Sequence, residues 1–259
     1  MLVRTQLLIL SAALLFSHNI FAAHALPEFT AKYAVESYGM KLAIARYQLS
    51  YTETGYKFTQ NTELYGFASM FRDDTVNAVS YVDDVNGTLL LQKHNYIQTG
   101  KEKNKNEDIS IQWHNANGAM AGTISGIVRG KKIKLQVTTP VWEVLSFQLP
   151  LMLEANKEKK VYPYHAIIQG EVDTYNFDLT SQEEIRFADK SYQALHVVRK
   201  DPNKDRQLHL WLVPELHNMP VLIENYRDGK KHSRMRLESV QFNAGKILRE
   251  IEIATDDDF

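Results

Sequence analysis

Four side chains that could bind a metal or act in catalysis fall within one short segment, QLHLWLVPELHNMPVLIENYRDG (residues 207–229). They are His209, Glu215, His217 and Glu224. A zinc site needs three or four such ligands converging at about 2 Å from the ion. His209 lies inside an apolar run and His217 lies in the turn that follows it, and neither His-x-His nor His-Glu-x-x-His occurs in the chain. The sequence therefore predicts no metal site and no cofactor.

Other catalytic arrangements have equally little support in the sequence. The segment GTISG (residues 122–126) differs from the Gly-x-Ser-x-Gly elbow of serine hydrolases, and the absence of cysteine excludes thiol nucleophiles and disulfides. A pair of carboxylates that hydrolyses polysaccharide is the enzymatic alternative, with Glu171 and Asp173 as candidates, because two acids can meet in a folded chain. We assign no catalytic residue, and the sequence favours a non-enzymatic protein.

The elements that carry the first four residues are predicted to be two strands joined by a short turn. In QLHLWLVP the side chains alternate, with Leu208, Leu210 and Leu212 on one face and His209, Trp211 and Val213 on the other. Both faces are largely apolar, so we expect this strand to be covered on both sides, by a helix or by a bound ligand.

The remainder of the mature chain repeats this pattern. Short segments with alternating apolar residues are separated by polar turns such as Asn86-Gly87, which favours a tight hairpin. We find no shift in composition that would mark a linker. The sequence thus predicts one all-β domain over residues 26–259, built from a curved antiparallel sheet that forms an incomplete β-barrel.

One segment, TPVWEVLSFQLPLMLEANKEKK (residues 139–160), interrupts the strands. Thr139 can cap a helix, Pro140 suits its first position, Glu143 suits its first turn, and Pro150 is expected to stop or kink it. Because the segment is more apolar than a solvent-exposed helix, we expect it to plug the barrel; one or two short helices are predicted in all.

The first 25 residues read as a signal peptide. Arg4 precedes an apolar run over residues 7–16, and small residues end the segment at Ala25. No later stretch is long and apolar enough for a transmembrane helix. We therefore expect a periplasmic protein without a helical span after cleavage. The net charge of -1 gives no basic field that would recruit nucleic acid.

Two features suggest other surface roles. The terminal Phe259 is compatible with an outer-membrane barrel, but three acids precede it and no aromatic girdle is evident. The basic segments RGKKIK (129–134) and RDGKKHSRMR (227–236) could contact anionic headgroups or acidic polysaccharide. Lysines that keep strand edges soluble explain these segments more simply.

The segment LHLWLVPELHNMPVLIENYRDGKKHSRMRLESVQF (residues 208–242) resembles the C-terminal signature of the bacterial family catalogued as domain of unknown function 3108. The matching positions are Trp211, Pro214, Pro220, Val221, Ile223 and Gly229. The opening strands FTAKYAVESYGMKLAIARYQLSY (29–51) are also similar to that family. The resemblance implies an exported, incomplete β-barrel without an established reaction, similar in shape to periplasmic carriers of lipoproteins.

Together these observations predict a non-enzymatic envelope protein that binds a lipid or another hydrophobic ligand, or a partner protein, inside the incomplete barrel. A structural component of an envelope complex is the other alternative to an enzyme. The residues that we expect to line the ligand site are Trp142, Phe147, Leu149, Met152, Leu210 and Trp211.

Overall fold

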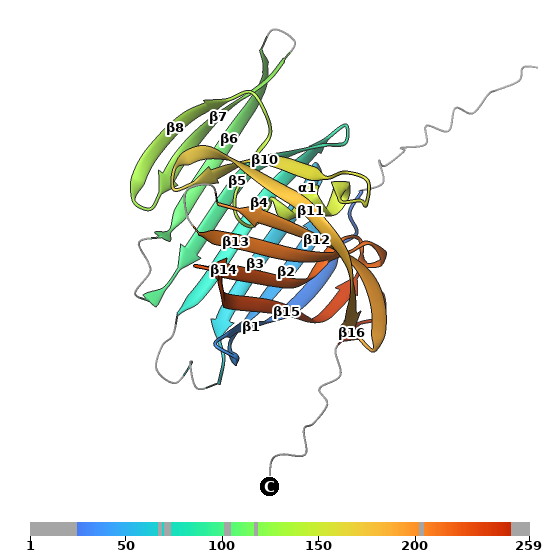
Figure 1. Cartoon of the computed structure of the whole chain (residues 1–259). Helices are drawn as coiled ribbons and strands as arrows, with labels where there is room; N and C mark the ends of the chain where they lie inside the picture. Colours follow the sequence, from blue (N-terminus) through green and yellow to red (C-terminus); the bar gives the residue numbers. More distant parts are fainter. Residues whose placement is uncertain are drawn as a thin grey trace, which may run out of the picture.

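A computed structural model describes residues 25–66, 69, 74–100, 105–116, 119–201 and 205–249 (Figure 1). All but the last residue of the expected signal peptide, and the terminal Phe259, lie outside these ranges. Cleavage of the leader and the assignment of the rest to one domain therefore stay predictions. Within the described ranges, no helix is long and apolar enough to cross a membrane.

The first half of the chain forms an antiparallel meander in which each strand pairs with the next. Its strands alternate between buried apolar and exposed polar residues, as in β1, where Phe29, Ala31 and Tyr33 are buried. The strands are β1 (Phe29–Ser37), β2 (Met40–Tyr51), β3 (Gly55–Leu64), β4 (Thr75–Val85), β5 (Thr88–Gln98), β6 (Glu107–Ala116), β7 (Ala119–Val128) and β8 (Lys131–Val137).

The predicted hairpin at Asn86-Gly87 joins β4 to β5. Both residues have positive φ angles, 54° and 83°, which only glycine and a few polar residues adopt readily. The twist of such a turn matches the twist of the strands, so a short connection suffices.

The second half of the chain forms another antiparallel meander, which returns to the first strand. Its strands are β10 (Val161–Ile168), β11 (Glu171–Phe187), β12 (Lys190–Lys200), β13 (Arg206–Val213), β14 (Met219–Arg227) and β15 (Lys230–Phe242). A 3-10 helix, η3 (Pro214–Leu216), connects β13 to β14, and the short β16 (Leu248–Arg249) pairs with β15. The register between β1 and β15 runs from Phe29 opposite Phe242 to Glu36 opposite Arg234.

This pairing joins both meanders and the two-residue strand β9 (Val141–Trp142) into one sheet with the order β8-β7-β6-β5-β4-β3-β2-β1-β15-β14-β13-β12-β11-β10-β9. The sheet curls until it nearly closes into a barrel, and it leaves one seam unsealed between its end strands (Figure 1). The prediction of an all-β fold with an incomplete barrel is confirmed.

The prediction that residues 139–160 form a plug is confirmed, and we call this segment the plug. The predicted start and end of its helix are wrong. Val141–Trp142 forms strand β9, which pairs in parallel with β10, and helix α1 spans Gln148–Glu154. Pro150 lies inside the first turn of α1 rather than at its end. It fits there because amide groups in the first turn have no partner within the helix.

The N-terminal side of the plug is held by the buried carboxylate of Glu143. It accepts hydrogen bonds from the Ser80 hydroxyl (2.7 Å) and from the backbone amides of Leu145 (2.6 Å) and Ser146 (2.8 Å). The Nδ1 atom of His94 lies 3.4 Å from the same carboxylate. Since Ser80 belongs to β4 and His94 to β5, these contacts attach the plug to the first meander.

The C-terminal side of the plug is held by the second meander. Asn218, in the turn before β14, donates hydrogen bonds from Nδ2 to the carbonyl oxygens of Met152 (2.7 Å) and Ala155 (3.0 Å). Carbonyl groups in the last turn of a helix need such external partners. The plug is thus hydrogen-bonded to the meanders on both sides of it.

Apolar packing unites these parts into one core that includes residues of both meanders and of the plug. Within this core the rings of Phe147 and Phe177 are stacked with a centroid distance of 5.2 Å, and the rings of Phe29 and Phe58 meet edge to face. Burying an aromatic or aliphatic side chain of this size contributes about 1.5 to 3 kcal/mol.

Replacement of Glu143 tests how the plug is attached. We expect Glu143→Ala to lower the free energy of unfolding by about 3 to 5 kcal/mol, because it leaves His94, Ser80 and two buried amides without their acceptor. Urea unfolding followed by circular dichroism measures the change. Glu158→Ala, at an exposed position after the helix, is the control and should change stability by less than about 0.5 kcal/mol. Equal effects of the two variants would show that apolar packing alone holds the plug.

Candidate functional site

A pocket of about 460 Å³ lies beside β9, one of the two end strands that border the seam, and we call it the seam pocket. The plug and β10, which follow each other in the chain, form it together with the distant β4–β5 turn. Strand β9 touches β10 over only two paired positions, His165 with Val141 and Ala166 with Trp142. The wall is therefore incomplete here, and side chains rather than a continuous ladder of hydrogen bonds bound the space. The seam pocket is lined by Gly87, Thr88, Leu89, Thr139, Pro140, Trp142, Pro150, Leu153, Glu154, Pro163, Tyr164 and His165.

The lining of the seam pocket combines apolar and polar groups. Leu89, Trp142, Leu153 and Tyr164 contribute much of its apolar surface, together with three prolines. Polar groups come from Thr88, Thr139, Glu154 and His165. Binding pockets for small molecules commonly have volumes of about 300 to 1,000 Å³ and a mostly apolar lining with a few polar groups. This composition suits an amphiphilic ligand better than a fully charged one.

The hydroxyl group of Tyr164 is an unusual feature of this pocket. It is buried and has no hydrogen-bond partner among the described residues. Burial raises the pKa of this hydroxyl well above its usual range, and the nearby Glu154 carboxylate raises it further. Two residues earlier, the Tyr162 hydroxyl is satisfied, since it donates to the carbonyl oxygen of Asn156 (2.7 Å) and accepts from the amide of Asn156 (3.0 Å). Buried polar groups without partners are rare and are destabilising.

Of the six residues expected to line a ligand site, Trp142 lines the seam pocket. Phe147, Leu149, Met152 and Leu210 belong to the packed core, and none of them lines a pocket described here. These four side chains thus fill part of the space expected between sheet and helix, and the seam pocket is the part that α1 and the strands leave open.

Trp211 lies on the opposite face of β13 from Leu210. Its ring stacks on His196 with a centroid distance of 4.2 Å, and its Nε1 donates to the Glu183 carboxylate at 2.8 Å. Hydrogen bonds from Ser181 and Trp211 hold the pKa of Glu183 below its usual value. The second apolar face of β13 is thus covered by neighbouring side chains of the sheet, not by the plug.

The fold separates the four potential metal ligands of residues 207–229. His209 and Glu224 lie opposite each other on β13 and β14, whereas Glu215 and His217 are exposed in the connection that includes η3. Three or more acidic or histidine side chains do not converge as a metal site anywhere in the part of the chain that the structure describes.

The carboxylates proposed for an enzyme are both exposed. Glu171 and Asp173 lie at the start of β11, and neither lines a pocket described here. A pair of catalytic carboxylates must flank a bound substrate. Their position gives no cleft for such a substrate.

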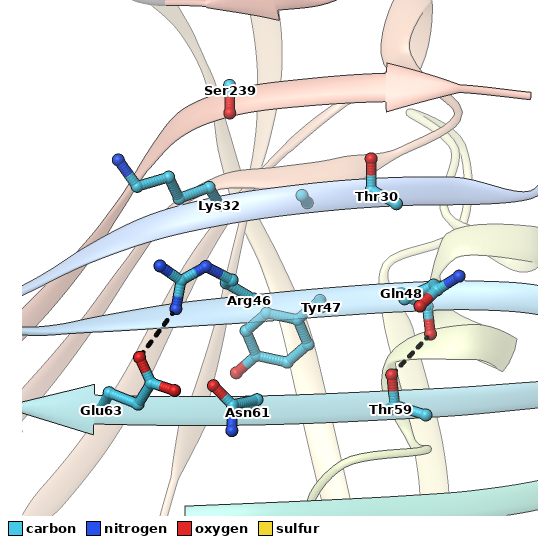
Figure 2. A pocket seen from close by; sticks show the side chains of 10 residues that line it. Thr30, Lys32, Arg46, Tyr47, Gln48, Thr59, Asn61, Glu63 and Ser239 are labelled. Atoms are coloured by element: carbon cyan, nitrogen blue, oxygen red, sulfur yellow. Dashed lines mark hydrogen bonds and ion pairs between the residues drawn. The ribbon is translucent and has the colours of Figure 1, made fainter. Parts of the chain in front are cut away.

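A larger depression of about 660 Å³ lies on the outer face of β15, β1, β2 and β3 (Figure 2). Its side chains alternate with the buried residues of these strands and are mostly polar. Its charged groups already have partners: Arg46 pairs with Glu63 at 3.1 Å, and Lys32 pairs with Glu238 at 2.9 Å. A polar surface with neutralised charges does not favour an apolar ligand.

A smaller pocket of about 180 Å³ lies beside the anchor of the plug, where Glu143 and His94 form part of its lining. Glu107 and Arg129 also line it and form an ion pair at 3.8 Å. Burial raises the pKa of Glu107 despite the opposing effects of His94 and Arg129. This pocket is below the usual volume of a small-molecule site.

Sequence reasoning missed most of the seam pocket, yet one signal was present. Pro163 lies within β10, and proline is confined to the edges of sheets because it cannot donate a hydrogen bond to a neighbouring strand. The segment VYPYHAII therefore indicated a strand beside an opening. Nothing in the sequence indicated that Leu89 or Leu153 would meet it.

Comparison with known proteins supports the family resemblance. A family model described as "Protein of unknown function (DUF3108)" matches residues 28–235. No curated protein matches the chain. No solved structure matches it either.

Substitutions of two tyrosines of β10 test whether the Tyr164 hydroxyl lacks a hydrogen-bond partner. We expect Tyr164→Phe to raise the free energy of unfolding by about 1 kcal/mol, because it removes a buried hydroxyl that has no partner. Tyr162→Phe should instead lower it by about 1 kcal/mol, since two hydrogen bonds are lost. Urea unfolding measures both. Destabilisation by Tyr164→Phe comparable to that of Tyr162→Phe would contradict the assignment.

His209 predicts a pH dependence of stability. Burial, followed by the charge of His196, lowers the pKa of His209. The pKa of this histidine in the unfolded chain is about 6.5, so near and below this pH the unfolded chain binds more protons at this site than the folded chain does. The free energy of unfolding therefore falls as the pH decreases from about 7.5 to about 5. We expect His209→Gln to reduce this decrease, measured by urea unfolding at several pH values. The exposed His114→Gln is the control and should leave it unchanged. A similar pH dependence in wild type and His209→Gln would refute the prediction.

Proposed function

The chain belongs to the DUF3108 family, and from the seam pocket we propose that it is an exported, non-enzymatic binding protein. Its ligand is an amphiphile whose apolar part lies in the seam pocket. Export and a periplasmic location rest on the N-terminal segment described above and belong to this proposal.

The proposal rests on the volume of the seam pocket, on the residues that line it and on its position in the fold. The seam pocket has about 460 Å³, and the apolar part of its mixed lining is supplied by Trp142, Leu89, Leu153 and neighbouring prolines. It lies beside β9, an end strand of the unclosed sheet, and we infer that an apolar chain enters there without opening the barrel. Polar groups such as Glu154 and His165 lie in the same lining and can contact a headgroup.

An apolar segment of an envelope protein is a second occupant that this lining accepts. The free edge of the sheet gives such a partner less support, because β8 carries lysines at positions 131, 132 and 134. Lysines on an edge strand discourage pairing with another strand. We therefore favour insertion of an apolar chain into the pocket over strand addition at the edge.

Intrinsic fluorescence provides a direct test, because Trp142 lines the pocket and Trp211 does not. Titration with lauroyl lysophosphatidylcholine below its micelle concentration should change the emission of the wild-type protein. Trp142→Phe should abolish most of this change, whereas Trp211→Phe should retain it. A response that depends on Trp211 instead would place the ligand elsewhere.

A second variant tests the apolar lining itself. Leu153→Glu places a charge against the expected acyl chain and should weaken binding about tenfold or more, because burying an unpaired charge is unfavourable. Val161→Glu introduces the same charge at an exposed position of β10 outside the pocket lining and is the matched control. The measurement is the same titration. Equal weakening by both variants, or no binding by the wild type, would overturn the proposal.

A further inference from the structure

Three arginines line a separate pocket of about 220 Å³, which we call the arginine pocket. They are Arg199 of β12, Arg206 of β13 and Arg227 of β14. No Asp or Glu belongs to its lining. The chain as a whole has a net charge of -1, so this concentration of positive charge is a local feature and not a consequence of composition.

The register of the strands brings these arginines together. Arg206 lies directly opposite Arg227, and Arg199 lies opposite Leu208, two residues after Arg206 on the same face of β13. Like charges that face each other across two strands are destabilising. Because facing arginines destabilise the sheet, binding of an anion explains their placement better than a contribution to the stability of the fold.

No acid forms a direct ion pair with the three guanidinium groups among the residues that the structure describes, and the turn residues Asp205 and Asp228 do not line the pocket. Burial raises the pKa of Tyr175, and Asp201 lies close enough to the Arg199–Tyr175 pair to raise it further, so Asp201 lowers the local positive charge without lining the pocket. The nearest buried acid in sequence, Glu224, accepts from Lys231, Arg234 and Tyr226 instead. Both of its oxygens are therefore already engaged.

One guanidinium group is held in place by an aromatic ring. Arg199 lies over Tyr175 at 3.3 Å from the ring centroid. Such stacking uses the face of the guanidinium group and leaves its N–H donors, which lie in the plane, free for an oxyanion. Preorganisation of this kind reduces the entropy that is lost on binding.

Uncharged donors complete the lining. Asn225 and Ser233 lie in the same cross-strand row as Arg199 and Leu208, and Gln207 and His232 also line the pocket. Several N–H and O–H donors around positive charge match a tetrahedral group with several acceptor oxygens.

We propose that the arginine pocket binds a phosphate group, either as the free ion or as part of an anionic lipid headgroup. The inference is independent of the seam pocket, because the two sites share no lining residue. Arg206 and Arg227 hold the phosphate between them, and Arg199, whose guanidinium group stacks on Tyr175 of β11, adds positive charge on the side of β12.

Two probes distinguish the sources of the phosphate. Isothermal titration with inorganic phosphate measures binding of the free ion, and flotation with phosphatidylglycerol vesicles, compared with phosphatidylcholine vesicles, measures recognition of an anionic headgroup. Binding of either probe that depends on the arginines supports the proposal. Binding of neither probe, in buffer of low ionic strength, overturns it.

Variants link the binding to this pocket. Arg206→Gln and Arg227→Gln should each weaken binding about tenfold, and the double variant more strongly, because charge-assisted hydrogen bonds are lost. Arg186→Gln makes the same change of charge at an exposed position of β11 outside the pocket and is the matched control. Equal weakening by Arg186→Gln would show a nonspecific charge effect and overturn the site.

Measurement of the melting temperature distinguishes a loss of phosphate binding from a loss of folding. Phosphate that binds only the folded protein should raise the melting temperature of the wild type, and this rise should disappear in the Arg206→Gln/Arg227→Gln variant. Without phosphate, the double variant should be at least as stable as the wild type, since the facing charges are removed. A double variant that unfolds more readily without phosphate would show that these arginines serve the structure.

Discussion

The pairing of β1 with β15 is the constraint on which the rest of the structure depends. It makes neighbours of strands from opposite ends of the chain, with Phe29 opposite Phe242, and so turns two local meanders into one curved sheet. The apolar faces of both meanders must then share one interior. A segment from the middle of the chain, the plug, packs in the same interior.

The plug explains why the barrel stays incomplete. The plug segment lies in the chain between β8 and β10, and Glu143 and Asn218 tie it to both meanders. Only Val141 and Trp142 extend the sheet, so the end strands do not form a continuous ladder and a seam remains. The seam pocket is thus a consequence of the way the interior is filled. The arginine pocket has a different origin, since it arises from register, which sets Arg206 against Arg227.

Much of the fold could be predicted, because alternation of side chains is a local property. The strands around Leu210, the hairpin at Asn86-Gly87 and the plug in the middle of the chain follow from sequence patterns with a period of two or from turn residues. The helix boundaries failed because Pro140 and Pro150 are both compatible with a first helical turn, and pairing of Val141 with β10 decided between them. Local preferences do not contain that long-range pairing.

By itself the sequence determined the all-β class, the turns, the absence of thiol chemistry and the family, since each depends on residue types or on neighbours along the chain. Only the tertiary structure decided where space remains. It buried Phe147 and Leu149 in the core, turned Trp211 outward, and brought Leu89, Trp142 and Leu153 together at the seam. Pockets depend on strand register and on the path of the plug, and these are settled by contacts between segments far apart in the chain.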